Sequence, residues 1–277
     1  VAARSYGAQD EDLLKKTVAG SLVIGFLSSL CITLAGLVGL HPLLVLLDTP
    51  AEILEEAYSY ILIIDVGVLV MFAYNLCAGL LRAIGNSFMP LVFLLISSGL
   101  NVALDLVFIA VVGMGVKGAA VATVISQGVS VVLCIFYVLR KTRVLVPERK
   151  HFQVGRKLYW DLFSQSISMG LMSSIVSAGS VVLQYGINGL GTLVIAGHTA
   201  ARKMFAFTDM PLIAMANAGS TFVSQNYGAN HPDRVRKGMR EIYLYSVVVA
   251  VLAVLLMNVG AEWMVKLISG SSEAVVL

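Results

Sequence analysis

The segment YGAQDEDLLKK (residues 6–16) recurs as YGANHPDRVRK (residues 227–237), and the similarity continues in register on both sides at an offset of 221 residues. Asp12, for example, corresponds to Asp233. Long apolar runs follow both copies, so we interpret the duplicated unit as a block of membrane-spanning helices. Membrane proteins with duplicated helix blocks are commonly transporters, whose binding site lies at the interface between the two copies.

The composition excludes a soluble globular protein. Of the 277 residues, 58% are hydrophobic and only 13% are charged, and the mean hydropathy is +0.89. Charged residues make up about a quarter of a typical soluble domain. The three cysteines, Cys31, Cys77 and Cys134, lie inside apolar runs and lack the spacing of a metal site, so they indicate packing. We therefore expect an all-α integral membrane protein.

The repeat also predicts helices outside this sequence. The second copy begins near Arg156, so the first should begin about 65 residues before Val1. The first copy ends near Leu145, so the second should end about 89 residues after Leu277. At about 30 residues per span, about two helices would precede the sequence and about three would follow it. We expect two partial lobes, at 1–145 and at 146–277, the second including a basic linker.

Apolar runs separated by turn residues indicate seven helices within the sequence. They are expected at about residues 13–40, 51–76, 89–112, 118–140, 158–185, 193–225 and 232–261, with an eighth beginning near Ser272. His41-Pro42 is expected to end the first of them, and Pro211 to kink the sixth.

Lys and Arg gather in alternate loops, which fixes the expected orientation. The basic loops lie around residues 1–16, 82–89, 140–157 and 228–240. Because cytoplasmic loops carry an excess of Lys and Arg, we expect these loops on the cytoplasmic side of a multi-pass protein of the inner cell membrane. The segment 140–157 is interpreted as a linker on the membrane surface, whose bases set topology and attract anionic lipid.

The third helix carries the strongest candidate site. Ser97, Asn101 and Asp105 follow the spacing i, i+4, i+8 and lie on one face. A charge inside a span is costly and therefore marks a functional site by default. Asp105 lies about 10 Å inside the outer end of its helix. Such a carboxylate can load a proton or bind Na⁺. The alternative is a buried Asp that only holds helices together.

Other polar side chains inside the spans are weaker candidates. Tyr60 and Thr123 reach a depth similar to that of Asp105, although either could be a helix-packing hydroxyl. Asp65 could serve a second protonation step or pair with a base outside the sequence. His198, Arg202 and Asp209 share one face of the sixth helix, and we favour an Arg202–Asp209 ion pair over substrate contact.

A polar face on the fifth helix could line a wet substrate cavity or permit close helix packing. Its members include Ser173, Ser177 and Gln184. The sequence contains no Ser–His–Asp arrangement, metal cluster or phosphate-binding loop. We therefore expect no catalysis and no cofactor.

Four motifs resemble the multidrug and toxic compound extrusion (MATE) family. They are RAIGN (82–86) followed by Pro90, NVALDLVFI (101–109), GVKGAAVAT (115–123), and the stretch from IAGH (195–198) to YGA (227–229). A MATE protein has twelve helices in two six-helix lobes. The resemblance implies that this sequence contains helices three to nine of that bundle, about seven spanning helices.

The resemblance also implies site residues. In the prokaryotic DinF-like branch, a cation site in the N-terminal lobe uses an Asp on helix one, which lies outside this sequence. The remaining positions of that site match Tyr60, Asn101, Asp105 and Thr123. Helix seven of other branches carries a Glu where this chain has Gln165, so a second cation site in the C-terminal lobe is not expected.

By this resemblance, the protein is expected to be an antiporter that exports amphipathic or cationic drugs and toxic organic compounds in exchange for H⁺ or Na⁺, with Na⁺ held at Asp105. Expected partners are small organic substrates and membrane lipid, without nucleic acid, and the protein is expected to be a monomer. A lipid-linked saccharide flippase of the same superfold is one alternative, but its cavity should be basic, whereas the interior charges here are mainly acidic. A seven-helix receptor is another, and the internal repeat opposes it.

Overall fold

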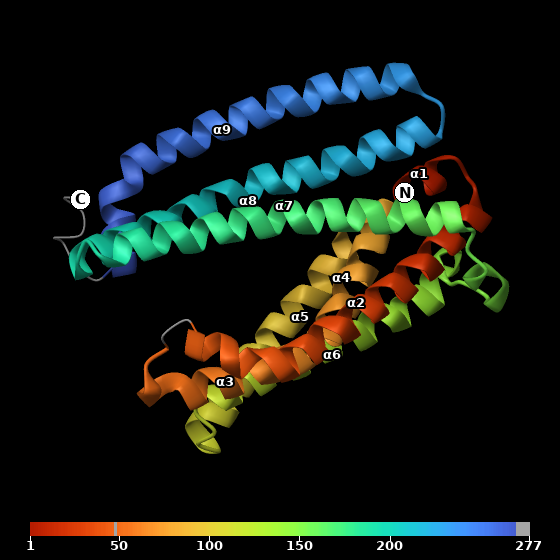
Figure 1. Ribbon diagram of the computed structural model, residues 1–277. Coiled ribbons are helices and arrows are strands. Elements are labelled where there is room, and N and C mark those ends of the chain that lie inside the picture. Colours follow the sequence, from red (N-terminus) through yellow and green to blue (C-terminus); the bar gives the residue numbers. More distant parts are fainter. Residues whose placement is uncertain (47–48, 270–277) are drawn as a thin grey trace. The chain divides into compact units, whose positions relative to one another are not determined.

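A computed structural model describes residues 1–46 and 49–269, and within these ranges the regular elements are helices (Figure 1). The expected eighth helix near Ser272 lies outside the described residues. In order, the elements are α1 (Ala2–Gly7), α2 (Glu11–Leu46), α3 (Ala51–Val66), α4 (Val68–Ala83), α5 (Phe88–Asp105), the π-helix η1 (Leu106–Val111), α6 (Val116–Lys141), the 3₁₀ turns η2 (Arg143–Leu145) and η3 (Arg149–Phe152), α7 (Arg156–Asn188), α8 (Thr192–Gly228) and α9 (Pro232–Ser269).

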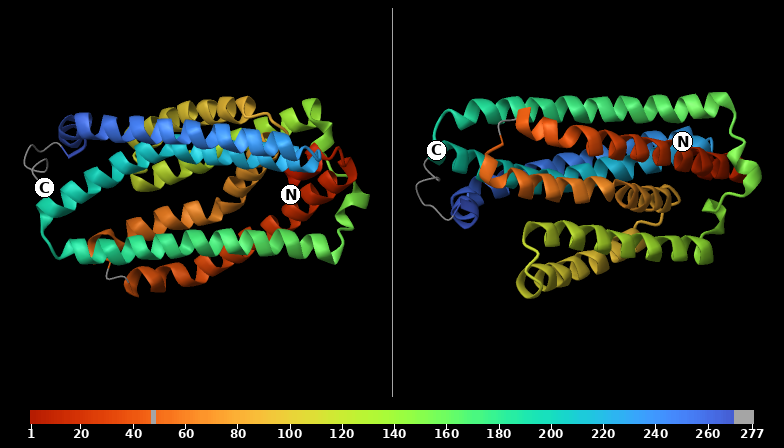
Figure 2. Two further views of the ribbon diagram at one scale, coloured as in Figure 1. Left: turned by 90° about the horizontal axis from the view of Figure 1, so that it is seen from above. Right: turned by 60° about the horizontal axis from the view of Figure 1, so that its bottom comes forward.

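The chain divides into two compact units, Val1–Leu162 and Phe163–Leu277. In the first unit, α6 packs against α3, α4 and α5, and α2 packs against α3 and α4. In the second unit, α8 and α9 run side by side (Figure 2). The boundary between the units falls inside α7, so the first two turns of this helix belong to the first unit.

The core of the first unit lies at one end of its bundle, where α2 and α5 begin and α4 and α6 end. Leu14, Leu81 and Cys134 are fully buried there, and Leu145 from the segment after α6 completes the cluster. Apolar side chains further along the helices are largely exposed. A soluble protein would not leave so much apolar surface in water, whereas lipid accepts it.

The helices have the length and apolarity of membrane spans. Five qualify: α2, α5 together with η1, α6, α7 and α9, and the bent pair α3–α4 makes a sixth if it forms one span. In the apolar 18-residue stretch that qualifies each helix as a span, only 11% is buried in α2 and none in α7. The side chains of these stretches therefore face outward, as lipid contact requires. α8 is long enough but more polar, since it carries Arg202, Lys203 and Asp209. The prediction of an all-α membrane protein is confirmed.

Several helix boundaries differ from the expected ones, and the helix expected at 232–261 continues to Ser269. The helix expected at 51–76 is broken at Gly67 into α3 and α4, with a bend of 46°. The expected end of a helix at His41-Pro42 is wrong, because α2 continues through Pro42 to Leu46. Proline removes one backbone hydrogen bond without ending a spanning helix. The neighbouring His41 packs edge-on against Tyr58 of α3, with the ring centroids 5.5 Å apart.

The sequence repeat is reproduced in the backbone. The amides of Gln9 and Asp10 donate to the carbonyls of residues 6 and 5, and those of Asn230 and His231 donate to the carbonyls of residues 227 and 226. Gln9 and Asn230 both adopt a left-handed conformation, with φ of 55° and 57°. This pattern is the Schellman motif, in which a left-handed residue ends a helix and satisfies its last carbonyls. The same turn therefore leads into α2 and into α9.

The basic segment after α6 packs against the beginning of α2. His151 of η3 is buried, with its Nε2 3.5 Å from an oxygen of Asp12, while its Nδ1 accepts the backbone N–H of Glu148 at 2.9 Å. Glu148 forms ion pairs with Lys150 at 3.2 Å and with Lys15 at 3.9 Å. The hydrogen bond from Lys150 holds the pKa of Glu148 below its usual value. We call η2, η3 and these contacts the linker clasp.

Candidate functional site

The candidate site lies where α5 changes its winding. Asp105 is the last residue of α5, and the π-helix η1 begins at Leu106. The amide of Val112 donates to the carbonyl of Val107, five residues back, at 2.9 Å. Single π turns inside a helix are frequent at functional sites, because the wider turn redirects the neighbouring side chains. Asp105 therefore lies at the junction between an α-helical and a π-helical segment, unlike the other residues of α5.

Asn101 and Thr123 join α5 to α6. The Nδ2 of Asn101 donates to the Oγ1 of Thr123 at 3.5 Å, and this hydroxyl in turn donates to the carbonyl of Ala119 at 2.9 Å. Because the Thr123 proton is directed to its own helix, its oxygen is the acceptor toward α5. The hydroxyl of Ser126 donates to the carbonyl of Thr123 at 2.9 Å. The polar chain thus continues along α6.

Asp105 lies one turn beyond Asn101 on the same face of α5. Its Oδ1 is buried and has no hydrogen-bond partner among the described residues. A buried carboxylate oxygen without a donor is costly, so the site favours an added proton or a bound cation. The carboxylate of Asp105, the amide oxygen of Asn101 and the hydroxyl of Thr123 are the kinds of oxygen ligand that hard cations take. Together they are suited to holding H⁺ or Na⁺.

Gly118 allows α6 to approach this site closely. A Cβ added to Gly118 would lie 3.0 Å from the Cβ of Phe108 in η1 and 3.1 Å from the Cβ of Met114. The same atom would lie 3.3 Å from the backbone carbon of Phe108, so backbone as well as side chains limits the space. The absence of a side chain at Gly118 therefore keeps the π-helix against the start of α6.

The structure brings only some of the expected residues together. Asn101 and Thr123 are bonded and Asp105 lies one turn from Asn101, whereas Tyr60, half-buried on α3, forms no hydrogen bond with these three in the part of the chain that is described. Ser126 and the π-helix were not predicted. Ser126 lies three residues after Thr123 in the sequence, but a hydroxyl alone does not distinguish a site from packing.

The weaker candidates lie elsewhere. Asp65 is at the end of α3, against α2, and one of its oxygens is buried. Ser173 and Ser177 are exposed on α7. Gln184 is half-buried on the same helix.

The expected ion pair between Arg202 and Asp209 is not found in residues 1–46 and 49–269, and that prediction is wrong. The two residues lie about 10 Å apart along the axis, and helical side chains lean toward the N-terminus, so that of Arg202 is directed away from Asp209. The Nε2 of His198, on the same face of α8, is buried without a hydrogen-bond partner within those ranges.

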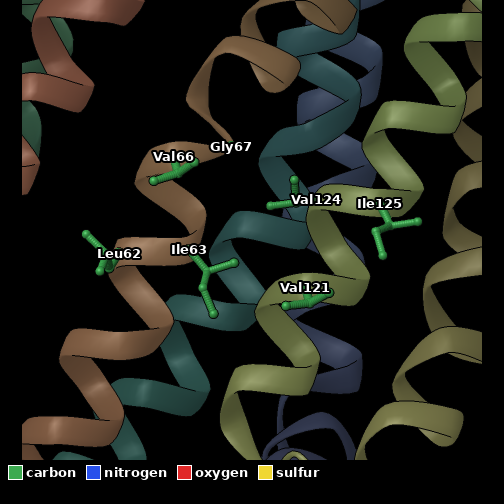
Figure 3. A pocket seen from close by; sticks show the side chains of 7 residues that line it. All are labelled: Leu62, Ile63, Val66, Gly67, Val121, Val124 and Ile125. Carbon is green, nitrogen blue, oxygen red and sulfur yellow. The ribbon is translucent and has the colours of Figure 1, made fainter.

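An apolar groove of about 290 Å³ lies between α3 and α6 (Figure 3). It is lined by Leu62, Ile63, Val66, Gly67, Val121, Val124 and Ile125. Val124 follows Thr123 directly in the chain, so the groove and the polar chain occupy neighbouring positions on α6. A hydrocarbon group fits this lining, whereas a charged group does not.

Comparison with known proteins gives a consistent result. A model of the MatE family matches residues 1–107 and 169–277. The chain is 32% identical over 197 residues to the probable multidrug resistance protein YpnP of Bacillus subtilis, covering 70% of this chain and 43% of YpnP. It is 25% identical over 261 residues to the probable multidrug resistance protein YoeA of the same organism, covering 91% of this chain and 56% of YoeA. The chain spans about half the length of these relatives.

Solved structures show the same fold. The chain matches a crystal structure of MATE in complex with MaD5 with a TM-score of 0.88 at 23% identity, over 99% of this chain and 63% of that one. It matches an outward-facing multidrug resistance MATE family transporter with a TM-score of 0.84 at 23% identity, over 96% of this chain and 60% of that one.

Proposed function

This chain belongs to the MATE family, and from that membership we propose that the protein is a secondary antiporter, which exports amphipathic or cationic organic compounds in exchange for an inward-moving cation. The observation that supports this most strongly is the buried, unpartnered Oδ1 of Asp105 beside the Asn101–Thr123 hydrogen bond. The names of the curated relatives, which include multidrug resistance and multidrug export proteins, support organic compounds as cargo.

In this proposal, Asp105 carries the coupling ion, H⁺ or Na⁺. With the ion bound, the carboxylate is neutralised and tolerates its buried position. Without the ion, the charged oxygen attracts the amide of Asn101, one turn away on the same helix face, and so weakens the bond of that amide to Thr123. Because that bond joins α5 to α6, the two forms of Asp105 favour different packings of these helices. A change in packing is what alternation between inward-open and outward-open states requires.

We further propose that the loops around 1–16, 82–89, 140–157 and 228–240 face the cytoplasm of an inner membrane. The excess of Lys and Arg in these loops supports the assignment. We also propose a monomer as the working unit, because in transporters of this kind the site lies between repeats of one chain.

Asp105→Asn in the full-length protein tests the coupling role. In proteoliposomes, an imposed pH gradient and, separately, an imposed Na⁺ gradient should each be tried as the driving force for efflux of a cationic dye. We expect one gradient to drive efflux in the wild type and neither to drive it in Asp105→Asn, because an amide carries no exchangeable charge. Asp161→Asn, which changes an exposed carboxylate at the start of α7, is the matched control.

Unchanged efflux by Asp105→Asn would reject the role of this residue. Thermal unfolding of both variants in detergent separates a coupling defect from misfolding. The gradient that drives the wild type identifies the coupling ion.

A further inference from the structure

A second carboxylate, separate from the Asn101–Thr123 pair, is held between helices of the first unit. Asp65 is the penultimate residue of α3, next to the 46° break that leads into α4. Its Oδ2 is fully buried and has no hydrogen-bond partner among the described residues. Buried carboxylates are expensive unless they are paired or neutral, so this atom requires an explanation.

The carboxyl group rests on the backbone of α2. A Cβ added to Gly36 would lie 2.8 Å from the Oδ1 of Asp65 and closer still to its Oδ2, inside any normal contact distance. One turn earlier, the hydroxyl of Thr33 donates to the main-chain carbonyl of Asp65 at 3.0 Å. Thr33 and Gly36 thus hold the end of α3 at two points, and we call them the Asp65 seat.

The seat favours a proton over any other counter-ion. A metal cation takes several oxygen ligands, whereas Gly36, which lies against the carboxyl group, has no side chain to supply one. The carboxyl group lies so close to the backbone of Gly36 that a hydrated ion does not fit between them. A proton adds almost no volume and gives the carboxyl group its own donor.

Among the described residues, the titratable and charged side chains on the helices packed against α3 do not pair with the Asp65 carboxylate. Within the described ranges, no ion pair or hydrogen bond joins any of them to the Oδ2 of Asp65. His41 packs on Tyr58, and the hydroxyl of Tyr74 donates to the carbonyl of Pro90. The full set comprises Glu11, Asp12, Lys15, Lys16, Cys31 and His41 on α2, Tyr74, Cys77 and Arg82 on α4, and Lys117, Cys134, Tyr137, Arg140 and Lys141 on α6.

We propose that Asp65 is a second proton-binding site, whose neutral form docks on Gly36 and whose charged form leaves the seat and loosens α3 from α2. On the opposite face of α3, Leu62 and Ile63 border the apolar groove toward α6 (Figure 3), whereas Gly67 lies close to Val124. Gly67, at the break, is the natural pivot. The site thus couples protonation to the angle between α3 and α4.

Dicyclohexylcarbodiimide tests the proposal directly, because this apolar reagent adds the O–H of a protonated carboxyl across its C=N bond. An acyl oxygen–carbon bond forms and the acid proton moves to nitrogen, so no further reactant is needed. The full-length protein is labelled at neutral pH in lipid and mapped by peptide mass. We expect an adduct at Asp65 and none at Glu52, Glu55 or Glu56, the water-exposed carboxylates of the same helix.

Two glycine variants provide a matched pair on α2. Gly36→Ala places a methyl group in the seat, whereas a Cβ at Gly39, one turn further on, meets nothing within 4 Å. We expect Gly36→Ala to lose most of the Asp65 adduct, because the displaced carboxyl reaches water, and Gly39→Ala to keep it. An unlabelled Asp65 in the wild type, or equal labelling in both variants, would overturn the proposal.

Two further measurements complete the test. Na⁺ should not protect Asp65 from the reagent, and protection would overturn the choice of a proton. Asp65→Asn, a neutral mimic of the acid, should unfold thermally no earlier than the wild type, whereas clear destabilisation would indicate that the charged form is the one docked. None of these readouts requires transport. The Asp65 proposal can therefore be refuted while the efflux test supports the role of Asp105, and the role of Asp105 can be refuted while the Asp65 proposal holds.

Discussion

Gly118→Ala should destabilise the first unit and impair the candidate ion site together. The added methyl carbon would lie 3.0 Å from the Cβ of Phe108, 3.1 Å from that of Met114 and 3.3 Å from the backbone of Phe108. Normal contacts between carbon atoms are about 3.5–4.0 Å. The π-helix and the start of α6 must therefore separate by several tenths of an ångström.

The expected cost follows from those three contacts. Extra methyl groups in a well-packed interior cost about 1–3 kcal/mol, because side chains and backbone must shift. Two of the contacts here involve Cβ atoms and one involves backbone, none of which can rotate away, so we expect a packing cost of about 2–3 kcal/mol. Alanine favours a helix over glycine by about 1 kcal/mol, which leaves a net cost of about 1–2 kcal/mol and, on the scaling for domains of comparable size, a fall in Tm of about 2–8 °C.

The matched control is Gly128→Ala on the same helix. A Cβ there would lie 3.9 Å from a methyl carbon of Val70, which is an ordinary contact. Alanine also favours a helix over glycine by about 1 kcal/mol, so this variant should be neutral or stabilised. Thermal unfolding in detergent and ion-driven dye efflux are measured on both. If Gly118→Ala unfolded no earlier than Gly128→Ala, the argument for a tight α6–π-helix contact would be refuted.

Two further predictions concern the repeat turn and the linker clasp. Gln9→Gly should raise the free energy of unfolding by about 0.5–1 kcal/mol, because glycine adopts positive φ without strain. Gln165→Gly, inside α7, should lower it by a similar amount. A change of the same sign and size in both variants would contradict the left-handed turn assigned at Gln9. Lys150 lowers the pKa of Glu148 in the folded protein. Their ion pair should therefore stabilise the clasp fully at pH values above 4.5, the usual pKa of a glutamate, and this stabilisation should be lost as the pH falls through the lowered pKa of Glu148. Hydrogen exchange of residues 143–152 should therefore be slower in the wild type than in Glu148→Gln at about pH 6. The two rates should become equal once the pH falls below the lowered pKa of Glu148, and a difference that persists below it would contradict this.

The helices could be predicted from the sequence because lipid imposes a simple rule. Apolar runs long enough to span a membrane must be helical, and the residues between them are visibly polar or turn-forming. Duplicated YGA segments likewise predicted a repeat that the backbone reproduces, since the Schellman turn depends on local hydrogen bonds. The Asn101–Asp105 stripe could be recognised because both residues lie on one helix face.

The remaining features depend on residues that are distant in the sequence. The break at Gly67 coincides with a close approach to Val124 of α6, and a glycine inside an apolar run does not reveal that neighbour. Asp65 was recognised as a buried acid, but its seat at Gly36 requires the packing of α2 on α3. Pro42 was expected to end a helix, because proline disfavours the helix interior. In the structure α2 continues past it to Leu46.

The twin turns at Gln9 and Asn230 also bear on how the protein arose. Every bond that defines each turn joins main-chain atoms only, so mutation can replace the side chains around it without disturbing its geometry. The residues after the left-handed position have indeed changed, from Asp10-Glu11 to His231-Pro232. An ancestral gene that encoded one copy of the repeat, duplicated and fused, would leave such a trace, and two copies of its product would have had to associate to form the interface between repeats.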